Sequence, residues 1–214
     1  MELVNQNFKD HCRRATRHDR LHDRRSQILI FLGPAGPDSS PEPINPLQHT
    51  GTPVPRPVRP KLRWMPPEWQ KQDPHKWISW NHANKKLETE TVYWITTASK
   101  TDKPHAAPVW GIWKNNRLYF ETDPKSPKGR NLASNPRIVF HVQDGLDTVI
   151  VRGTAKREKN QAKLKSLKTM YTRKYNYTPN WSKPKNQIVF NVTPKIAHAW
   201  RAPRMHRNLV NFIF

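Results

Sequence analysis

Apolar and polar positions alternate with a period of two in the run RLYFET, Arg117–Thr122. This period predicts a strand with one buried face. The preceding segment, residues 106–113, is rich in β-branched and aromatic residues, and Lys114-Asn115-Asn116 separates it from RLYFET. Because asparagine tolerates the positive φ that a two-residue turn requires, the pattern predicts a β-hairpin.

More strands and two longer helices are predicted around this hairpin. A helix begins at Asp73, an N-cap followed by proline, and continues through HKWISWNHANKKLE. A second helix, about residues 156–175, places leucines and tyrosines on one stripe. The Asp144-Gly145 pair indicates a tight turn between two strands. The other predicted strands are residues 91–98, 137–142, 148–154, 187–192 and 196–200.

Six or seven short strands with two peripheral helices and no alternation of strand and helix predict a mainly β fold. The expected architecture is an antiparallel barrel with helices at its periphery. The last residues, Leu209-Val210 and Phe212-Ile213-Phe214, are apolar. We expect this end to be buried, with a second subunit as one candidate for what covers it.

The first 64 residues differ from the remainder in composition. Nine of the 21 prolines fall between Pro34 and Pro60, which excludes a helix or a central strand there. The stretch before them is rich in arginine, aspartate and histidine without apolar periodicity. We therefore expect residues 1–64 to be a disordered extension and linker, and residues 65–214 to be the folded domain.

Cysteine and histidine usage limits the chemistry. The single cysteine, Cys12, allows no internal disulfide, which is consistent with a cytoplasmic protein. The ten histidines show no metal-ligand spacing, so no metal is assigned. The run Ile28 to Leu32 is too short for a signal sequence or a membrane span, and no membrane association is expected.

The loop after the hairpin combines groups that could hold a phosphate. Ser126 is a plausible N-cap, with Pro127 at the first position of a short helix that ends near Asn135-Pro136. Free N–H groups at the helix start could converge there with two hydroxyls and two cations. Spacing alone slightly favours a solvated surface loop instead. The candidate phosphate ligands are Thr122, Ser126, Lys128 and Arg130.

The charge of the chain is strongly positive. The formal net charge is +22, and 27 of the 38 Lys and Arg but only 10 of the 16 Asp and Glu follow residue 64. A positive field of this size attracts polyanions, so a nucleic-acid-binding module is one hypothesis. The basic residues are spread over several elements and form no known recognition motif, which leaves solubility as the simpler explanation.

Three consecutive blocks carry a resemblance to a known family: YWITTASKTDKPHAAPVWGIW, LYFETDPKSPKGRNLASNPRIVFHV and DTVIVRGTAKRE. They resemble the FMN-binding split-barrel family of pyridoxamine 5′-phosphate oxidase and its relatives that use the deazaflavin coenzyme F-420. The resemblance covers the middle third of the chain strongly and the segment from Pro66 onward more loosely. It implies a split β-barrel and a homodimer with a flavin at the subunit interface.

The resemblance also assigns residues. It implies that Thr122, Ser126 and Lys128 contact the FMN phosphate; Arg130 is added only for its charge. The isoalloxazine ring would lie along the strand that contains Val109, Trp110 and Gly111, and Thr148 occupies the position of a flavin-contacting Gln in the oxidase. Two positions depart from the oxidase: Pro127 stands where the oxidase has an Arg next to the phosphate Lys, and Ala106 lies near the position of another basic phosphate ligand. These departures make oxidation of vitamin B6 a weaker expectation than flavin binding.

The function implied is hydride transfer between the flavin and an unidentified small molecule, with no side chain assigned as a catalytic acid or base. The cofactor is FMN or, as the alternative, F-420. A flavin- or haem-binding protein without turnover is the second hypothesis, and the nucleic-acid-binding module is the third.

Overall fold

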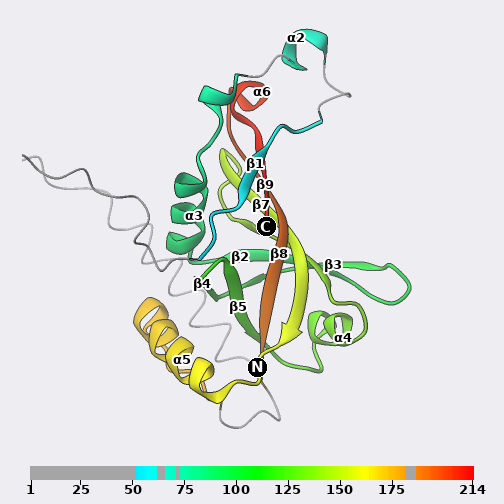
Figure 1. Ribbon diagram of the computed structural model, residues 1–214. Coiled ribbons are helices and arrows are strands. Elements are labelled where there is room, and N and C mark those ends of the chain that lie inside the picture. The colour runs from blue at the N-terminus through cyan, green and yellow to red at the C-terminus, as the bar shows by residue number, and fades with distance from the viewer. Residues whose placement is uncertain (1–51, 62–65, 71–72, 182–186) are drawn as a thin grey trace, which may run out of the picture. The chain divides into compact units, whose positions relative to one another are not determined.

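The computed structural model describes residues 52–61, 66–70, 73–181 and 187–214, and its strands are arranged as an antiparallel split β-barrel (Figure 1). The predicted hairpin is confirmed as β4 (Gly111–Lys114) and β5 (Arg117–Thr122). Asn115 and Asn116 form its turn with φ of 50° and 54°, the left-handed values that the sequence indicated.

The predicted strand over residues 106–113 is divided in two at Trp110. β3 (Pro104–Val109) pairs with β2 (Tyr93–Ala98), whereas β4 pairs with β5. The chain therefore changes partner at Trp110 while remaining extended. Gly111 allows the close approach of the strands there, because a Cβ at Gly111 would lie 2.9 Å from the Tyr119 carbonyl oxygen.

A single long strand, β8 (Ile188–Arg201), joins the two halves of the barrel. One end of β8 pairs with β5 and the other end pairs with β9 (Val210–Ile213). Every residue of β7 (Asp147–Arg157) faces a residue of β8. β6 (Arg137–Val142) then connects β7 to β2. The predicted strands 187–192 and 196–200 are thus one strand. The register between β7 and β8 shifts at Gly153, and this shift lets β8 continue past Pro194.

The helices begin at side-chain caps, not all of which were predicted. Asp73 caps only a short 3-10 helix, η1 (Pro74–Lys76), and Ser79 caps the separate helix α3 (Trp80–Thr89). The predicted first helix is therefore two elements. The second begins later than expected, as α5 (Gln161–Tyr175), because Lys156 and Arg157 pair with β8 as part of β7. The remaining helices are α2 (Pro67–Gln70), α4 (Pro127–Ser134) and α6 (Met205–Asn208).

Both ends of the described chain join the sheet. β1 (Arg56–Val58), within the segment expected to be a linker, pairs with β9 alone, so Pro57 lies on an edge strand. The sheet thus begins upstream of Met65, and residues 1–51 lie outside the described ranges. Val210 and Phe212 of β9 are buried inside the same chain, so their burial requires no second subunit.

The apolar residues form two main clusters. The larger fills the barrel and includes Tyr93, Phe140 and Phe212, whereas a smaller one lies between α5 and the outer face of β4 and β5. In the described ranges, no helix is both long and apolar enough to traverse a bilayer. The same residues contain no cluster of His, Cys, Asp and Glu that could hold a metal ion.

Candidate functional site

The loop between β5 and α4 brings two predicted ligands together. Thr122 is the last residue of β5 and is buried, and its Oγ1 lies 3.0 Å from Ser126 Oγ. Ser126 caps α4 as predicted: its Oγ accepts the Gly129 N–H at 3.1 Å and donates to the Asp123 carbonyl at 2.7 Å. The two hydroxyls therefore stabilise the turn between β5 and α4, and Ser126 also caps the first turn of α4.

Lys128, two residues after Ser126 in α4, supplies a partly desolvated cation. Its side chain is half-buried, and none of the described residues makes a hydrogen bond or ion pair with its ammonium. Burial lowers the pKa of Lys128, and the attraction of Asp123 opposes that shift only in part. A half-buried ammonium without an acceptor is a favourable partner for an anion.

The start of α4 has fewer free backbone N–H donors than the sequence indicated. Pro127 has no N–H, the Gly129 N–H is bonded to Ser126 Oγ, and the Arg130 N–H to the Ser126 carbonyl. Within the first turn, only the Lys128 N–H has no acceptor among the described residues. One backbone donor is thus left for a ligand, not several.

The loop backbone passes very close to α4 at Gly129. A Cβ at this position would lie closer than 3.0 Å to the Asp123 carbonyl oxygen and to two atoms of Pro124. Glycine is therefore required for the loop to fold over the helix start. Arg130, an exposed residue, donates from Nη1 to the Lys125 carbonyl, so it closes the outside of the same loop.

Helix α4 holds the loop against the barrel. Asn131 donates from Nδ2 to Thr97 Oγ1 of β2 at 3.1 Å, and Leu132 is buried in the main core. Because both contacts fix the helix on β2, the positions of Ser126 and Lys128 are determined by the barrel.

The strand predicted to lie along a flavin ring faces α5 in this chain. Val109 is buried in the core, and the Trp110 ring stacks on Tyr175 at 4.8 Å and an interplanar angle of 4°. The Gly111 N–H donates to Tyr175 Oη at 2.8 Å, and its carbonyl accepts from Lys174 Nζ at 3.1 Å. The backbone N–H of Gly111 is therefore already bonded.

Thr148 lies far from the β5–α4 loop of its own chain, because it pairs with Trp200 near one end of β8 and Thr122 pairs with Ile188 at the other end. Thr148 is the second residue of β7, whereas Thr154 of β7 pairs with Arg137, close after α4. Six residues of extended strand separate these two threonines by about 20 Å. The hydroxyl of Thr148 donates to the Asp144 carbonyl at 3.2 Å.

The family of the chain follows from its sequence. The family model described as pyridoxamine 5′-phosphate oxidase matches residues 80–201, more than half of the 214-residue chain, and includes the whole β5–α4 loop. The chain belongs to the pyridoxamine 5′-phosphate oxidase family. A comparison with curated proteins found no match.

Solved structures agree with this family fold. A conserved hypothetical protein from Mycobacterium tuberculosis is 18% identical, with a TM-score of 0.53, over 63% of this chain and 91% of its own. At that identity the likeness shows the fold alone. An F420 reductase (20% identity, TM-score 0.45, 53% and 94% of the two chains) and the haem storage protein HutZ from Vibrio cholerae (11%, 0.47, 54% and 89%) are more distant in structure.

Glu121, a partly buried acid of β5, was not singled out from the sequence. The Glu121 carboxylate accepts hydrogen bonds from Trp181 Nε1 at 2.5 Å and from Tyr171 Oη at 3.4 Å. Burial raises the pKa of Glu121, and it also raises the pKa of Tyr175. In sequence, Glu121 looks like the exposed position of an alternating strand, so no local signal indicates its burial.

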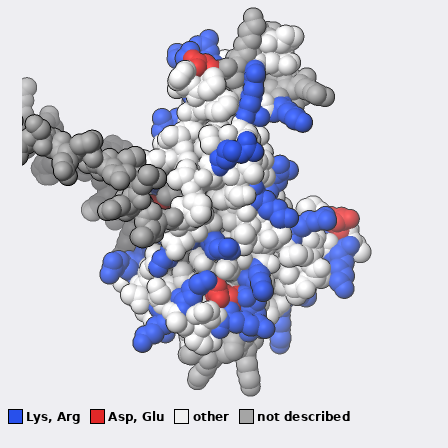
Figure 2. Space-filling view, in the orientation of Figure 1, with Lys and Arg blue, Asp and Glu red and all other residues white. Residues whose placement is uncertain are grey.

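The surface of the chain that carries the β5–α4 loop is rich in positive charge. Figure 2 shows Lys and Arg spread over the visible face, with few Asp or Glu between them. Together with Lys128 and two hydroxyls, this field suits a phosphate group. The β5–α4 loop is therefore the candidate anion site.

Proposed function

We propose that the chain is a flavin-dependent oxidoreductase that binds the phosphate of FMN in the β5–α4 loop. Its redox partner would be a small molecule not yet identified. Membership of the pyridoxamine 5′-phosphate oxidase family supports this function. The observation that carries it is the half-buried ammonium of Lys128, unpaired among the described residues, in the loop whose Thr122 and Ser126 hydroxyls lie together.

Each loop residue has a separate role in this proposal. Lys128 contributes charge and its backbone N–H, and the Thr122 and Ser126 hydroxyls donate once they turn from their internal acceptors. Arg130 keeps the loop closed through the Lys125 carbonyl. Gly129 allows the close approach that gives the loop its shape.

The ring would lie near Val109, Trp110 and Gly111, where the chain passes from β3 to β4. A bound flavin supplies hydride transfer, and the protein supplies orientation and exclusion of water. Trp110 is held flat against Tyr175 and is only partly exposed, so it offers a rigid apolar wall between β3 and β4.

A homodimer is part of the proposal, because Thr148 cannot serve the loop of its own chain. With about 20 Å of β7 between Thr148 and the strand end near α4, this residue would contribute to a flavin bound by the neighbouring subunit. The active form would therefore contain two symmetric sites.

F-420 is the alternative cofactor, since its anionic polyglutamate tail would also be attracted by the basic surface. Purification of the full chain, followed by absorbance and mass spectrometry of the released small molecule, distinguishes the candidates. An absorption maximum at about 450 nm is expected for bound FMN, and one at about 420 nm for bound F-420. A colourless protein that binds neither compound at micromolar concentration would reject the proposal.

A further inference from the structure

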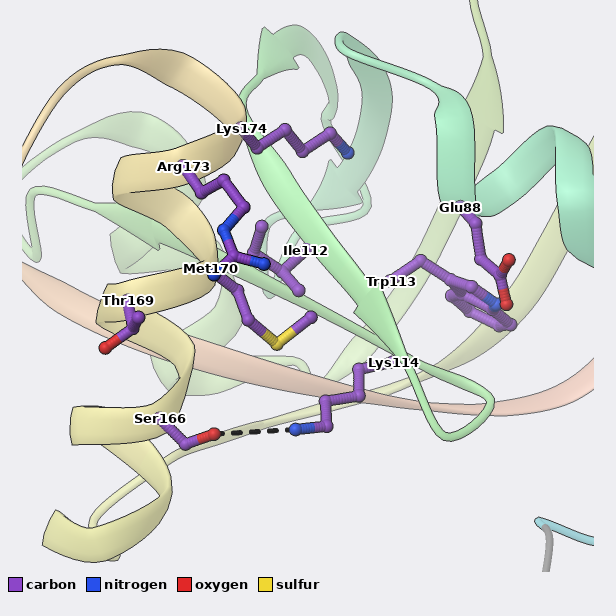
Figure 3. Close-up of a pocket in the computed structure, with 9 residues that line it drawn as sticks. All are labelled: Glu88, Ile112, Trp113, Lys114, Ser166, Thr169, Met170, Arg173 and Lys174. Atoms are coloured by element: carbon purple, nitrogen blue, oxygen red, sulfur yellow. Dashed lines mark hydrogen bonds between the residues drawn. The ribbon is translucent and has the colours of Figure 1, made fainter.

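A separate cavity of about 450 Å³ lies between α3, β4 and α5 (Figure 3). Volumes of this size are typical of sites for small organic ligands. None of the residues that line it belongs to the β5–α4 loop. The lining residues are Glu88, Ile112, Trp113, Lys114, Ser166, Thr169, Met170, Arg173 and Lys174.

The floor and one wall of the cavity are apolar. Ile112 and Trp113 are almost fully buried beneath it, and Met170 extends from α5 and packs against the cluster that contains Ile112 (Figure 3). The Trp113 indole N–H is bonded to Asn84 Oδ1 at 2.8 Å, so its ring presents only carbon to the cavity. A flat or apolar ligand body could pack on this surface.

The polar groups of the cavity are mainly cationic. Arg173 extends from α5 toward the centre, and Lys114 reaches from β4 to within 3.4 Å of Ser166 Oγ (Figure 3). Lys174 lies at the inner end, where its Nζ is 3.1 Å from the Gly111 carbonyl and 3.4 Å from Tyr93 Oη. Among the described residues, no carboxylate forms an ion pair with any of these three side chains.

The one acid in the lining does not neutralise this charge. Glu88 comes from α3, on the opposite wall, and its carboxylate accepts a hydrogen bond from Asn84 at 2.6 Å. Three positive side chains therefore line a common space. An anion placed between Arg173 and Lys114 would relieve their repulsion and gain charge-assisted hydrogen bonds.

We propose that this cavity binds a small organic anion, with its charged group between Lys114 and Arg173 and its apolar body on Ile112 and Met170. Lys174 supports the same preference from the inner end. An ammonium has three donors, and its two neutral oxygen partners leave one available. The burial that lowers the pKa of Lys174 to about 8 also favours a negative ligand close by.

Fluorescence titration of the full chain with anilinonaphthalene sulfonate tests the proposal, because this probe joins an anionic group to an aromatic body. Saturable binding is expected, with much weaker binding of the uncharged phenylnaphthylamine. Arg173→Met and Lys114→Met should each raise the dissociation constant of the anionic probe about tenfold. Neither change should affect the uncharged probe.

Lys165→Met is the matched control, because Lys165 is exposed on α5 and does not line the cavity. Equal weakening by Lys165→Met and Arg173→Met would show a diffuse surface field and overturn the proposal. Met170→Trp fills the cavity and should abolish binding, so undiminished binding by that variant would also overturn it. Lys128→Ala should leave the probe affinity unchanged, which separates this test from the proposed flavin site.

Discussion

Tyr175 Oη lies 2.8 Å from the Gly111 amide nitrogen, so a side chain of α5 holds the backbone of β4 directly after the chain changes strand partner. Tyr175 Oη also lies 2.9 Å from the Thr91 carbonyl oxygen, to which it can donate. This one hydroxyl therefore connects the helix with two segments on the outside of the barrel.

Tyr175→Phe should destabilise the fold, because the buried Gly111 N–H would lose its acceptor. An unsatisfied buried donor costs about 1–3 kcal/mol. Urea unfolding of both proteins measures this difference. Tyr177→Phe is the control, since Tyr177 is 42% exposed, and an equal effect of the two changes would contradict the role assigned to Tyr175.

Lys128→Ala should weaken binding of FMN by about 1–3 kcal/mol, because the variant removes a charge-assisted contact with the phosphate. Isothermal titration with FMN gives the dissociation constants. Lys125→Ala removes an equal charge from an exposed position of the same loop and should have a much smaller effect. An unchanged dissociation constant in Lys128→Ala would remove this residue from the site.

Gly129→Ala should distort the β5–α4 loop, because the new Cβ would overlap the Asp123 carbonyl and the Pro124 backbone. We expect the free energy of unfolding to fall by about 1–3 kcal/mol, with a lower melting temperature and weaker FMN binding. Gly145→Ala is the matched control, since a Cβ there has no heavy atom within 4 Å. Equal melting temperatures for the two variants would contradict the packing argument.

Locally determined features could be predicted from the sequence. The Asn115-Asn116 turn and the Ser126-Pro127 helix start each depend on residues next to one another, and both form as expected. The division at Trp110 could not be predicted, because the chain stays extended while its neighbours change.

Contacts between distant residues explain the rest. The bond between Tyr175 and Gly111 spans 64 residues, and the burial of Lys128 depends on how α4 packs on the barrel. Of the candidate site, the sequence therefore indicated the loop and its residue types. It did not indicate the bonded state of Gly111 or the separation of Thr148 from the loop.

The pH dependence of stability should have a maximum on the alkaline side. Burial lowers the pKa of Lys174 from 10.5 to about 8, so between these values the unfolded chain binds more protons and stability rises with pH. Burial also lowers the pKa of Lys128, which acts in the same direction. The buried tyrosines Tyr93, Tyr171 and Tyr175 have raised pKa values, so stability should fall again above about pH 10.

Chemical unfolding at several pH values tests this assignment. In Lys174→Met, the rise above about pH 8 should be smaller than in the original chain, while the loss above about pH 10 should persist. Lys165→Met, which changes an exposed lysine of the same helix, should keep the original profile. If stability rises above about pH 8 by the same amount in Lys174→Met as in the original chain, groups other than Lys174 cause that rise.

Deletion of the first 64 residues should cost stability, because it removes β1 from the edge of the sheet. The deletion would expose the edge of β9 at Asn211, Phe212 and Ile213, and would remove the Pro53 carbonyl that accepts from Asn116 Nδ2 at 2.8 Å. A chain that begins at His49, the first residue of the compact unit, keeps these contacts. We expect the chain beginning at Met65 to unfold with about 2 kcal/mol less free energy than the chain beginning at His49. Equal unfolding free energies would mean that β1 contributes nothing to the sheet, and the boundary expected from the sequence would then be adequate.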